Sequence, residues 1–183
     1  MSQTLDLIGP ESTMAQVLVA FPGAQRALFR RYHIGGCSSC GFQPGETLDQ
    51  LCRRNNNLNV IEVLAHIKSS HEQDAKILVT PAEVAAWRAQ NPALRLLDVR
   101  TREEFEAVHV EGAVLMSQPL MQEILGHWPR GEPFVIYDHQ GKQGLDAAAY
   151  FLGHGFEHVR CLRGGIDAWA TDVDPKMPRY KLG

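Results

Sequence analysis

The spacing of apolar positions divides this chain into a helical part and a mixed part. Over roughly the first 70 residues, apolar side chains recur at helical intervals and predict helices at residues 13–20, 24–32, 47–54 and 59–68. Thr13, Thr47 and Asn59 are each followed three residues later by Glu or Gln, the signature of a capping box that starts a helix. We expect the apolar positions of these helices to form one small core, made of Val17, Leu18, Phe21, Leu28, Leu48, Leu51, Val60, Val63 and Leu64.

Short apolar runs alternate with helix signals in the rest of the chain. Strands are predicted at residues 94–99, 113–116, 134–137 and 158–162, and helices at 81–90, from Thr101, and at 145–153. This alternation indicates an α/β fold with a central, mostly parallel sheet flanked by helices. We therefore predict a small all-α domain at 1–70, a polar linker at 71–76 and an α/β domain at 77–183.

Composition and charge exclude several classes of partner. The chain is 44% hydrophobic and 21% charged with a net charge of −3, so neither a nucleic acid nor a membrane surface is an expected partner. No secretory leader is visible, and no run of about 18 apolar residues could span a bilayer, so a cytoplasmic location is expected. In that reducing compartment the four cysteines are not expected to form structural disulfides.

Three sequence blocks stand out in the second part of the chain. They are Asp98-Val-Arg100 with Glu104 and His109, the strand–loop–helix stretch at 135–144, and Gly164-Gly165 with Trp169. In this order the blocks resemble the rhodanese domain, over about residues 77–182. The resemblance implies an α/β domain whose active loop begins with a cysteine that carries sulfur as a persulfide and usually ends with an arginine.

Several residues of these blocks have structural explanations. Arg100 can pair with Glu104 at the start of a helix, and Asp98 can cap the same turn. We interpret His109 as a structural histidine. Cys161 falls on a predicted buried strand, where a cysteine behaves as a small hydrophobic side chain.

The loop that corresponds to the active loop contains no thiol. It consists of Asp138, His139, Gln140, Gly141, Lys142 and Gln143. Because a carboxylate is a poor acceptor of sulfane sulfur, we expect no sulfur transfer at this loop. We expect Asp138 instead to turn into the loop, to accept hydrogen bonds from its amides and to exclude external anions. A hydrolase that uses His139 and Lys142, or phosphoryl transfer to Asp138, gains no support from a second acidic pair or metal-ligand cluster.

The remaining cysteines cluster in the helical part, as Cys37-Ser-Ser-Cys40 and Cys52. With Tyr32-His33-Ile34 before them, they resemble the N-terminal domain of iron–sulfur cluster repair di-iron proteins and a related domain associated with hybrid-cluster proteins. The two serines between the cysteines, and the lack of a second His- and Glu-rich helical domain, depart from the repair proteins, so the resemblance implies no di-iron centre.

Three uses of these cysteines remain open. They could perform disulfide or persulfide chemistry, or they could be structural. They could also hold zinc, iron or an iron–sulfur cluster, with Cys37, Cys40, Cys52 and His33 as ligands.

We therefore predict a two-domain, rhodanese-like protein that lacks the active-site cysteine. Its expected role is that of a non-catalytic binding or regulatory module in sulfur or iron–sulfur metabolism, which acts on a protein partner or sulfur carrier. The alternatives are a sulfurtransferase or persulfide carrier that uses Cys37 and Cys40, and a metal-binding redox sensor.

Overall fold

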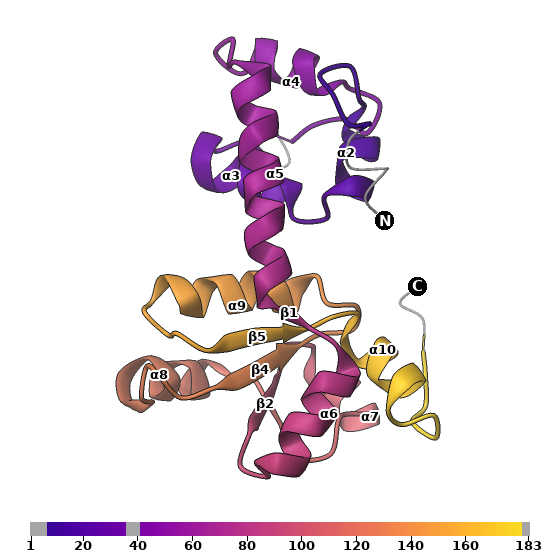
Figure 1. The fold of residues 1–183 in the computed structure, drawn as a ribbon, viewed down its shortest axis with the longest axis vertical. Coiled ribbons are helices and arrows are strands. Elements are labelled where there is room, and N and C mark those ends of the chain that lie inside the picture. Colours follow the sequence, from indigo (N-terminus) through magenta and orange to yellow (C-terminus); the bar gives the residue numbers. More distant parts are fainter. Residues whose placement is uncertain (1–6, 36–40, 181–183) are drawn as a thin grey trace. The chain divides into compact units, whose positions relative to one another are not determined.

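A computed structural model of the chain describes residues 7–35 and 41–180. The chain divides into two compact units, Met1–Ala75 and Lys76–Gly183 (Figure 1). The first is helical and the second is built around a sheet.

The first unit contains α2 (Met14–Ala20), α3 (Ala24–Tyr32), α4 (Leu48–Arg54) and most of α5 (Val60–Ile77). The predicted capping boxes at Thr13 and Thr47 are both present, which explains why α2 and α4 begin where the sequence predicts. Seven of the nine predicted core positions are buried in one cluster, and Leu18 and Val60 pack against it.

The predicted polar linker at residues 71–76 is helical. These residues form the last turns of α5, which ends at Ile77. Lys76 lies in the last turn of this helix, where a positive charge interacts favourably with the helix dipole. Ile77 packs against a core cluster of the second unit. The boundary between the two units falls within this stretch, between Ala75 and Lys76, and the helix predicted at residues 59–68 continues through it.

The second unit contains a five-stranded sheet whose strand pairs are all parallel, in the order β1-β5-β4-β2-β3. The strands are β1 (Leu78–Val79), β2 (Arg95–Asp98), β3 (Ala113–Leu115), β4 (Phe134–Tyr137) and β5 (Val159–Leu162). Four of them match predicted strands, and the two-residue β1 was not predicted. The predicted fold class is confirmed.

Helices cover both faces of this sheet (Figure 1). On one face, Phe134 and Ile136 of β4 pack with side chains of α8 (Gln118–His127) and α9 (Gln143–Gly153). On the other, Val135 and Tyr137 pack with α6 (Pro81–Gln90) and α10 (Gly165–Asp172). Successive residues of a strand point to opposite faces, so β4 is buried throughout and reads as a continuous apolar run. Helices α8 and α10 were not predicted.

Candidate functional site

The loop at residues 138–142 follows the central strand of the sheet. Strand β4 ends at Tyr137, and α9 begins at Gln143. The carboxyl edge of a parallel sheet is where α/β proteins place their sites, because loops and helix N-termini converge there. The loop predicted to correspond to the rhodanese active loop lies at this edge.

The Asp138 carboxylate is turned into its own loop. Its Oδ1 accepts a hydrogen bond from the Gly141 amide, and its Oδ2 accepts from the amides of Gln143 at 2.5 Å and Gly144 at 3.2 Å. The residue is 4% exposed. The prediction that Asp138 accepts hydrogen bonds from the loop amides is therefore confirmed. Its negative charge also lies at the N-terminus of α9, where the helix dipole stabilises it.

Glycine residues at the start of α10 allow its backbone to pack directly against this loop. A Cβ on Gly165 would lie 2.3 Å from the Asp138 carbonyl oxygen, and Gly165 has a φ of +61°. The Ile166 amide donates to that carbonyl at 2.9 Å, and the Asp167 amide donates to the carbonyl of His139 at 3.2 Å. The Gly164-Gly165 block of the sequence thus fixes the backbone of the loop from the side of α10.

A cavity of about 300 Å³ lies beside the loop. It is lined by Val99, Arg100, Thr101, Glu104, Asp138, His139, Gln140, Lys142 and Gln143. Asp138, His139 and Arg100 are buried, whereas Gln140, Lys142 and Gln143 are exposed. All six predicted loop residues except Gly141 line the cavity, and none of them carries a thiol.

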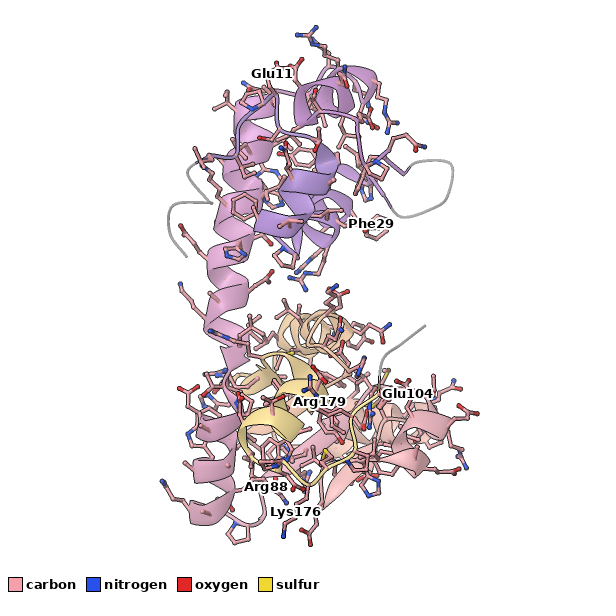
Figure 2. All side chains as sticks on the ribbon, turned by 90° about the vertical axis from the view of Figure 1, so that its right-hand side faces the viewer. Glu11, Phe29, Arg88, Glu104, Lys176 and Arg179 are labelled. Atoms are coloured by element: carbon pink, nitrogen blue, oxygen red, sulfur yellow. The ribbon has the colours of Figure 1, made fainter. Side chains whose placement is uncertain are left out.

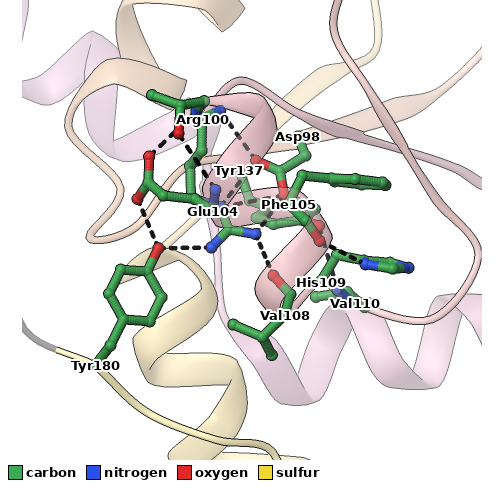
Figure 3. A network of polar contacts seen from close by, with 10 residues as sticks. Asp98, Arg100, Glu104, Phe105, Val108, His109, Val110, Tyr137 and Tyr180 are labelled. Carbon is green, nitrogen blue, oxygen red and sulfur yellow. Dashed lines mark hydrogen bonds and ion pairs between the residues drawn. The ribbon is translucent and has the colours of Figure 1, made fainter.

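Arg100, which lines the cavity, forms a buried ion pair with Asp98 (Figure 3). Its Nε donates to both carboxylate oxygens at 2.9 and 3.1 Å, and its Nη2 donates at 2.6 Å. Asp98 also accepts from the Arg100 amide at 3.0 Å, which is the predicted cap of this turn. The predicted pairing of Arg100 with Glu104 is wrong, because Asp98 lies closer and already holds the guanidinium group.

Hydrogen bonds link Arg100 to Glu104 through Tyr180, a residue that the sequence did not single out (Figure 3). Arg100 Nη1 donates to the Tyr180 hydroxyl at 2.7 Å, and this hydroxyl donates to Glu104 Oε1 at 2.6 Å. Burial, and then the hydrogen bond to Glu104, raise the pKa of Tyr180. Burial opposes ionisation of Glu104, but the hydrogen bonds from Tyr180 and Thr101 outweigh it, so the pKa of Glu104 is lowered.

The His139 ring is held against Tyr180. The two rings stack with centroids 4.5 Å apart and planes 15° apart, and His139 Nε2 donates to the Tyr180 carbonyl oxygen at 3.0 Å. A carbonyl oxygen only accepts, so Nε2 carries a proton. The other ring nitrogen, Nδ1, is buried and has no hydrogen-bond partner among residues 7–35 and 41–180. His109 instead stacks on Phe105, in agreement with a structural role.

The cysteines singled out in the sequence differ in their surroundings. Cys37 and Cys40 lie outside the described residues. Cys52 lies in the core of the helical unit, and burial, with a smaller effect of Asp49, raises the pKa of its thiol to about 11. A protonated, buried thiol is a poor nucleophile and a poor metal ligand. Cys161 is buried beneath the loop, with its Sγ 3.9 Å from the Gly141 carbonyl oxygen.

The fourth candidate metal ligand, His33, is exposed. It ends α3 in a left-handed conformation and contacts Phe29 edge to face, with ring centroids 6.2 Å apart. Phe29 is itself 47% exposed (Figure 2). Within residues 7–35 and 41–180, no three histidine, cysteine or acidic side chains are grouped as metal ligands would be. Those same residues contain no helix that is long and apolar enough to cross a membrane.

Comparison with known proteins identifies the second unit. The model of the rhodanese-like domain family matches residues 80–172, half of the chain. The chain belongs to the rhodanese-like domain family. The match contains β2 to β5, the loop and α10, but it ends before Tyr180. The match does not include the helical unit.

Curated relatives resemble this chain over the same region. The probable adenylyltransferase/sulfurtransferase MoeZ of Mycobacterium tuberculosis is 35% identical over 104 residues, which are 56% of this chain and 26% of MoeZ. The thiosulfate sulfurtransferase GlpE of Pseudomonas syringae is 29% identical over 93 residues, 51% of this chain and 86% of GlpE. The chain thus spans about a quarter of the length of the first relative. A crystal structure of the Alr3790 protein from Anabaena aligns over 57% of this chain and 82% of its own, with 26% identity and a TM-score of 0.46.

Proposed function

We propose that the rhodanese-like unit is a binding or regulatory module that does not transfer sulfur through its loop. The Asp138 carboxylate, which accepts hydrogen bonds from three amides of the loop, is the observation that carries this proposal. Formation of a persulfide needs a thiolate, and a carboxylate cannot replace it.

The same contacts oppose binding of an anionic sulfur donor. Loop amides that point toward one place at a helix N-terminus form a site for an anion. Here the protein supplies that anion itself. A donor such as thiosulfate would have to displace Asp138 from the Gly141, Gln143 and Gly144 amides and would be repelled by its charge.

The context that we propose is sulfur or iron–sulfur metabolism, with a protein or sulfur carrier as partner. Membership of a family with sulfurtransferase relatives supports this context. In this proposal any thiol chemistry of the helical unit is assigned to Cys37 and Cys40, because Cys52 is buried in the core. This unit resembles the N-terminal domain of iron–sulfur cluster repair proteins in its cysteine block.

A thiosulfate–cyanide sulfurtransferase assay on the purified chain tests the proposal. We expect the wild type to remain at background and the Asp138→Cys chain to take up sulfur, detected as a gain of one sulfur atom in the intact mass. Asp172→Ala, which removes an exposed carboxylate from the end of α10, is the matched control.

Turnover by the wild type would refute the proposal, and two variants would then show which part of the chain transfers sulfur. Loss of that turnover in Asp138→Ala would assign sulfur transfer to the loop. Loss in a Cys37→Ser/Cys40→Ser chain would assign it to the helical unit and would favour the alternative of a relocated thiol.

A further inference from the structure

Arg179 and Tyr180 lie across the second unit as a bound dipeptide would. The Arg179 guanidinium donates to Asp167 twice, from Nε at 2.7 Å and from Nη2 at 2.9 Å (Figure 2 labels Arg179). Tyr180 stacks on His139, and its hydroxyl joins Arg100 and Glu104 (Figure 3). We call the surface formed by Arg100, Glu104, His139 and Asp167 the dipeptide groove.

The dipeptide groove distinguishes the chemical features of its occupant. Asp167 takes a guanidinium in a two-pronged contact, which an ammonium group cannot make. Arg100 donates to a hydroxyl that must in turn donate to Glu104, so the site requires a phenol rather than a bare ring. His139 adds a stacking surface and a donor for the backbone carbonyl. The groove is therefore complementary to Arg followed by Tyr.

The groove is held in place by contacts that do not involve its occupant. Arg100 is fixed by Asp98 and by the Val108 carbonyl oxygen at 2.7 Å. The Glu104 carboxylate accepts from the Thr101 amide at 3.1 Å, in a complete capping box. A site whose side chains are already oriented loses little entropy when a ligand binds.

The occupant is attached much less firmly than the groove. Met177 is the last described residue that packs against a core cluster of this unit, and residues 178–180 lie in neither helix nor strand. Beyond Met177 the described part of the segment is held by the Asp167 pair, by the Tyr180 hydroxyl and carbonyl, and by two contacts of the Tyr180 ring, with His139 and with the Arg100 guanidinium. None of residues 178–180 belongs to a core cluster, so their release would break only these exchangeable contacts.

We propose that the dipeptide groove is a docking site for a partner protein that carries an exposed Arg-Tyr pair, and that Arg179 and Tyr180 fill it until the partner displaces them. This inference rests on the proposed function, because it names the kind of partner that the binding module recognises. Segment 179–180 is thus an internal competitor. A tethered competitor acts at an effective concentration of about 1 mM. If segment 179–180 has an intrinsic Kd of about 0.1 mM for the groove, a partner peptide binds the wild type about tenfold more weakly than it binds the open groove.

The test is a fluorescence titration of the full chain with a labelled peptide of residues 174–180, Asp-Pro-Lys-Met-Pro-Arg-Tyr. We expect the Arg179→Ala/Tyr180→Ala chain to bind this peptide about tenfold more tightly than the wild type does. Adding Asp167→Asn to the double variant removes a charge-assisted contact and should weaken binding again by about tenfold. Lys176→Ala, which removes a neighbouring exposed charge, should bind like the wild type (Figure 2).

Two results would overturn the inference. One is equal binding of the peptide to the wild type and to the double variant, and the other is equal binding of a control peptide that ends in Ala-Ala. If the double variant does not fold, as judged by its thermal melting, the single Arg179→Ala chain replaces it. That chain loses only an exposed ion pair, and an unchanged affinity for the peptide would then refute the proposal.

The inference and the proposed function fail separately. Thiosulfate–cyanide turnover by the wild type would refute the non-catalytic role. It would not change the peptide affinities that test the dipeptide groove. If the folded Arg179→Ala/Tyr180→Ala chain does not bind the peptide, the dipeptide groove is not a docking site. That result would not bear on the Asp138 contacts.

Discussion

Replacement of Asp138 by alanine would leave the loop amides without the anion that they surround. The amides of Gly141, Gln143 and Gly144 would each lose a hydrogen bond to a charged acceptor. Such bonds are worth about 1.5–3 kcal/mol when they are removed singly. The three losses do not add, because the hydrogen bonds of the Gly141 and Gln143 amides are only partly buried and water can replace the lost carboxylate there, whereas the hydrogen bond of Gly144 is buried. We therefore expect a total loss of about 3 kcal/mol in the free energy of unfolding.

An external anion should restore most of this loss. Sulfate can accept the same hydrogen bonds at the helix N-terminus. If it binds the empty loop with a Kd of about 1 mM, then 100 mM sulfate stabilises Asp138→Ala by about 2.7 kcal/mol. In the wild type the carboxylate already occupies this place, so only the general effect of sulfate on protein stability is expected there.

The assay is urea denaturation of both chains, at equal ionic strength, in sodium chloride and in sodium sulfate. The informative quantity is the difference between the two chains in their stabilisation by sulfate, with Asp172→Ala as the control for loss of one surface carboxylate. Equal stabilisation of the wild type and Asp138→Ala would refute the reasoning. A loss of less than about 1 kcal/mol in Asp138→Ala would refute it too, since a single hydrogen bond to a charged group is worth more than that.

Three further predictions concern other parts of the chain. Asp74→Ala should lower the free energy of unfolding by about 3 kcal/mol in urea denaturation, because it removes one partner of a nearly buried ion pair with Arg26; a loss near zero contradicts this. Cys52 should be alkylated at pH 7 only after unfolding, as peptide mass mapping would reveal, because its thiol has a pKa of about 11 and is 1% exposed. Glu104→Gln keeps the capping box with Thr101, so its stability should fall below that of the wild type only where Glu104 is ionised. Since the folded pKa of Glu104 is lowered from 4.5, that difference should be present at neutral pH and disappear as the pH falls through the folded value.

Much of the local structure follows from short-range signals. Helices α2, α4 and α6 begin one residue after Thr13, Thr47 and Thr80, because a threonine with Glu or Gln three residues later satisfies the free amides of the first turn. Strand β4 was predicted with its exact bounds, since four consecutive buried residues give an unmistakable apolar run. The missed helices lack this complete signal. Helix α8 is capped by Ser117, but the third residue after it is Leu120 and not Glu or Gln. Helix α10 begins at Gly165 without a side-chain cap.

The least predictable part of the candidate site is its long-range pairing. Tyr180 meets Arg100 across 80 positions of sequence and Glu104 across 76. No spacing rule connects residues so far apart. Arg100 also shows how a local rule fails, because the predicted helical pair with Glu104 competes with Asp98, whose carboxylate is already positioned by the turn.

The sequence by itself determined the fold class, the position of the loop and the absence of a thiol in it, because these depend on apolar periodicity and on the identity of one residue, Asp138. It also implied that this carboxylate would turn inward, since a loop before a helix N-terminus presents amides to the nearest anion. Only the tertiary structure decided that Cys52 is a core thiol, that Arg100 belongs to Asp98, and that Tyr180 lies on His139. Burial and pairing between distant segments arise when the sheet brings the ends of separate elements together, and no local pattern in the chain encodes those distances.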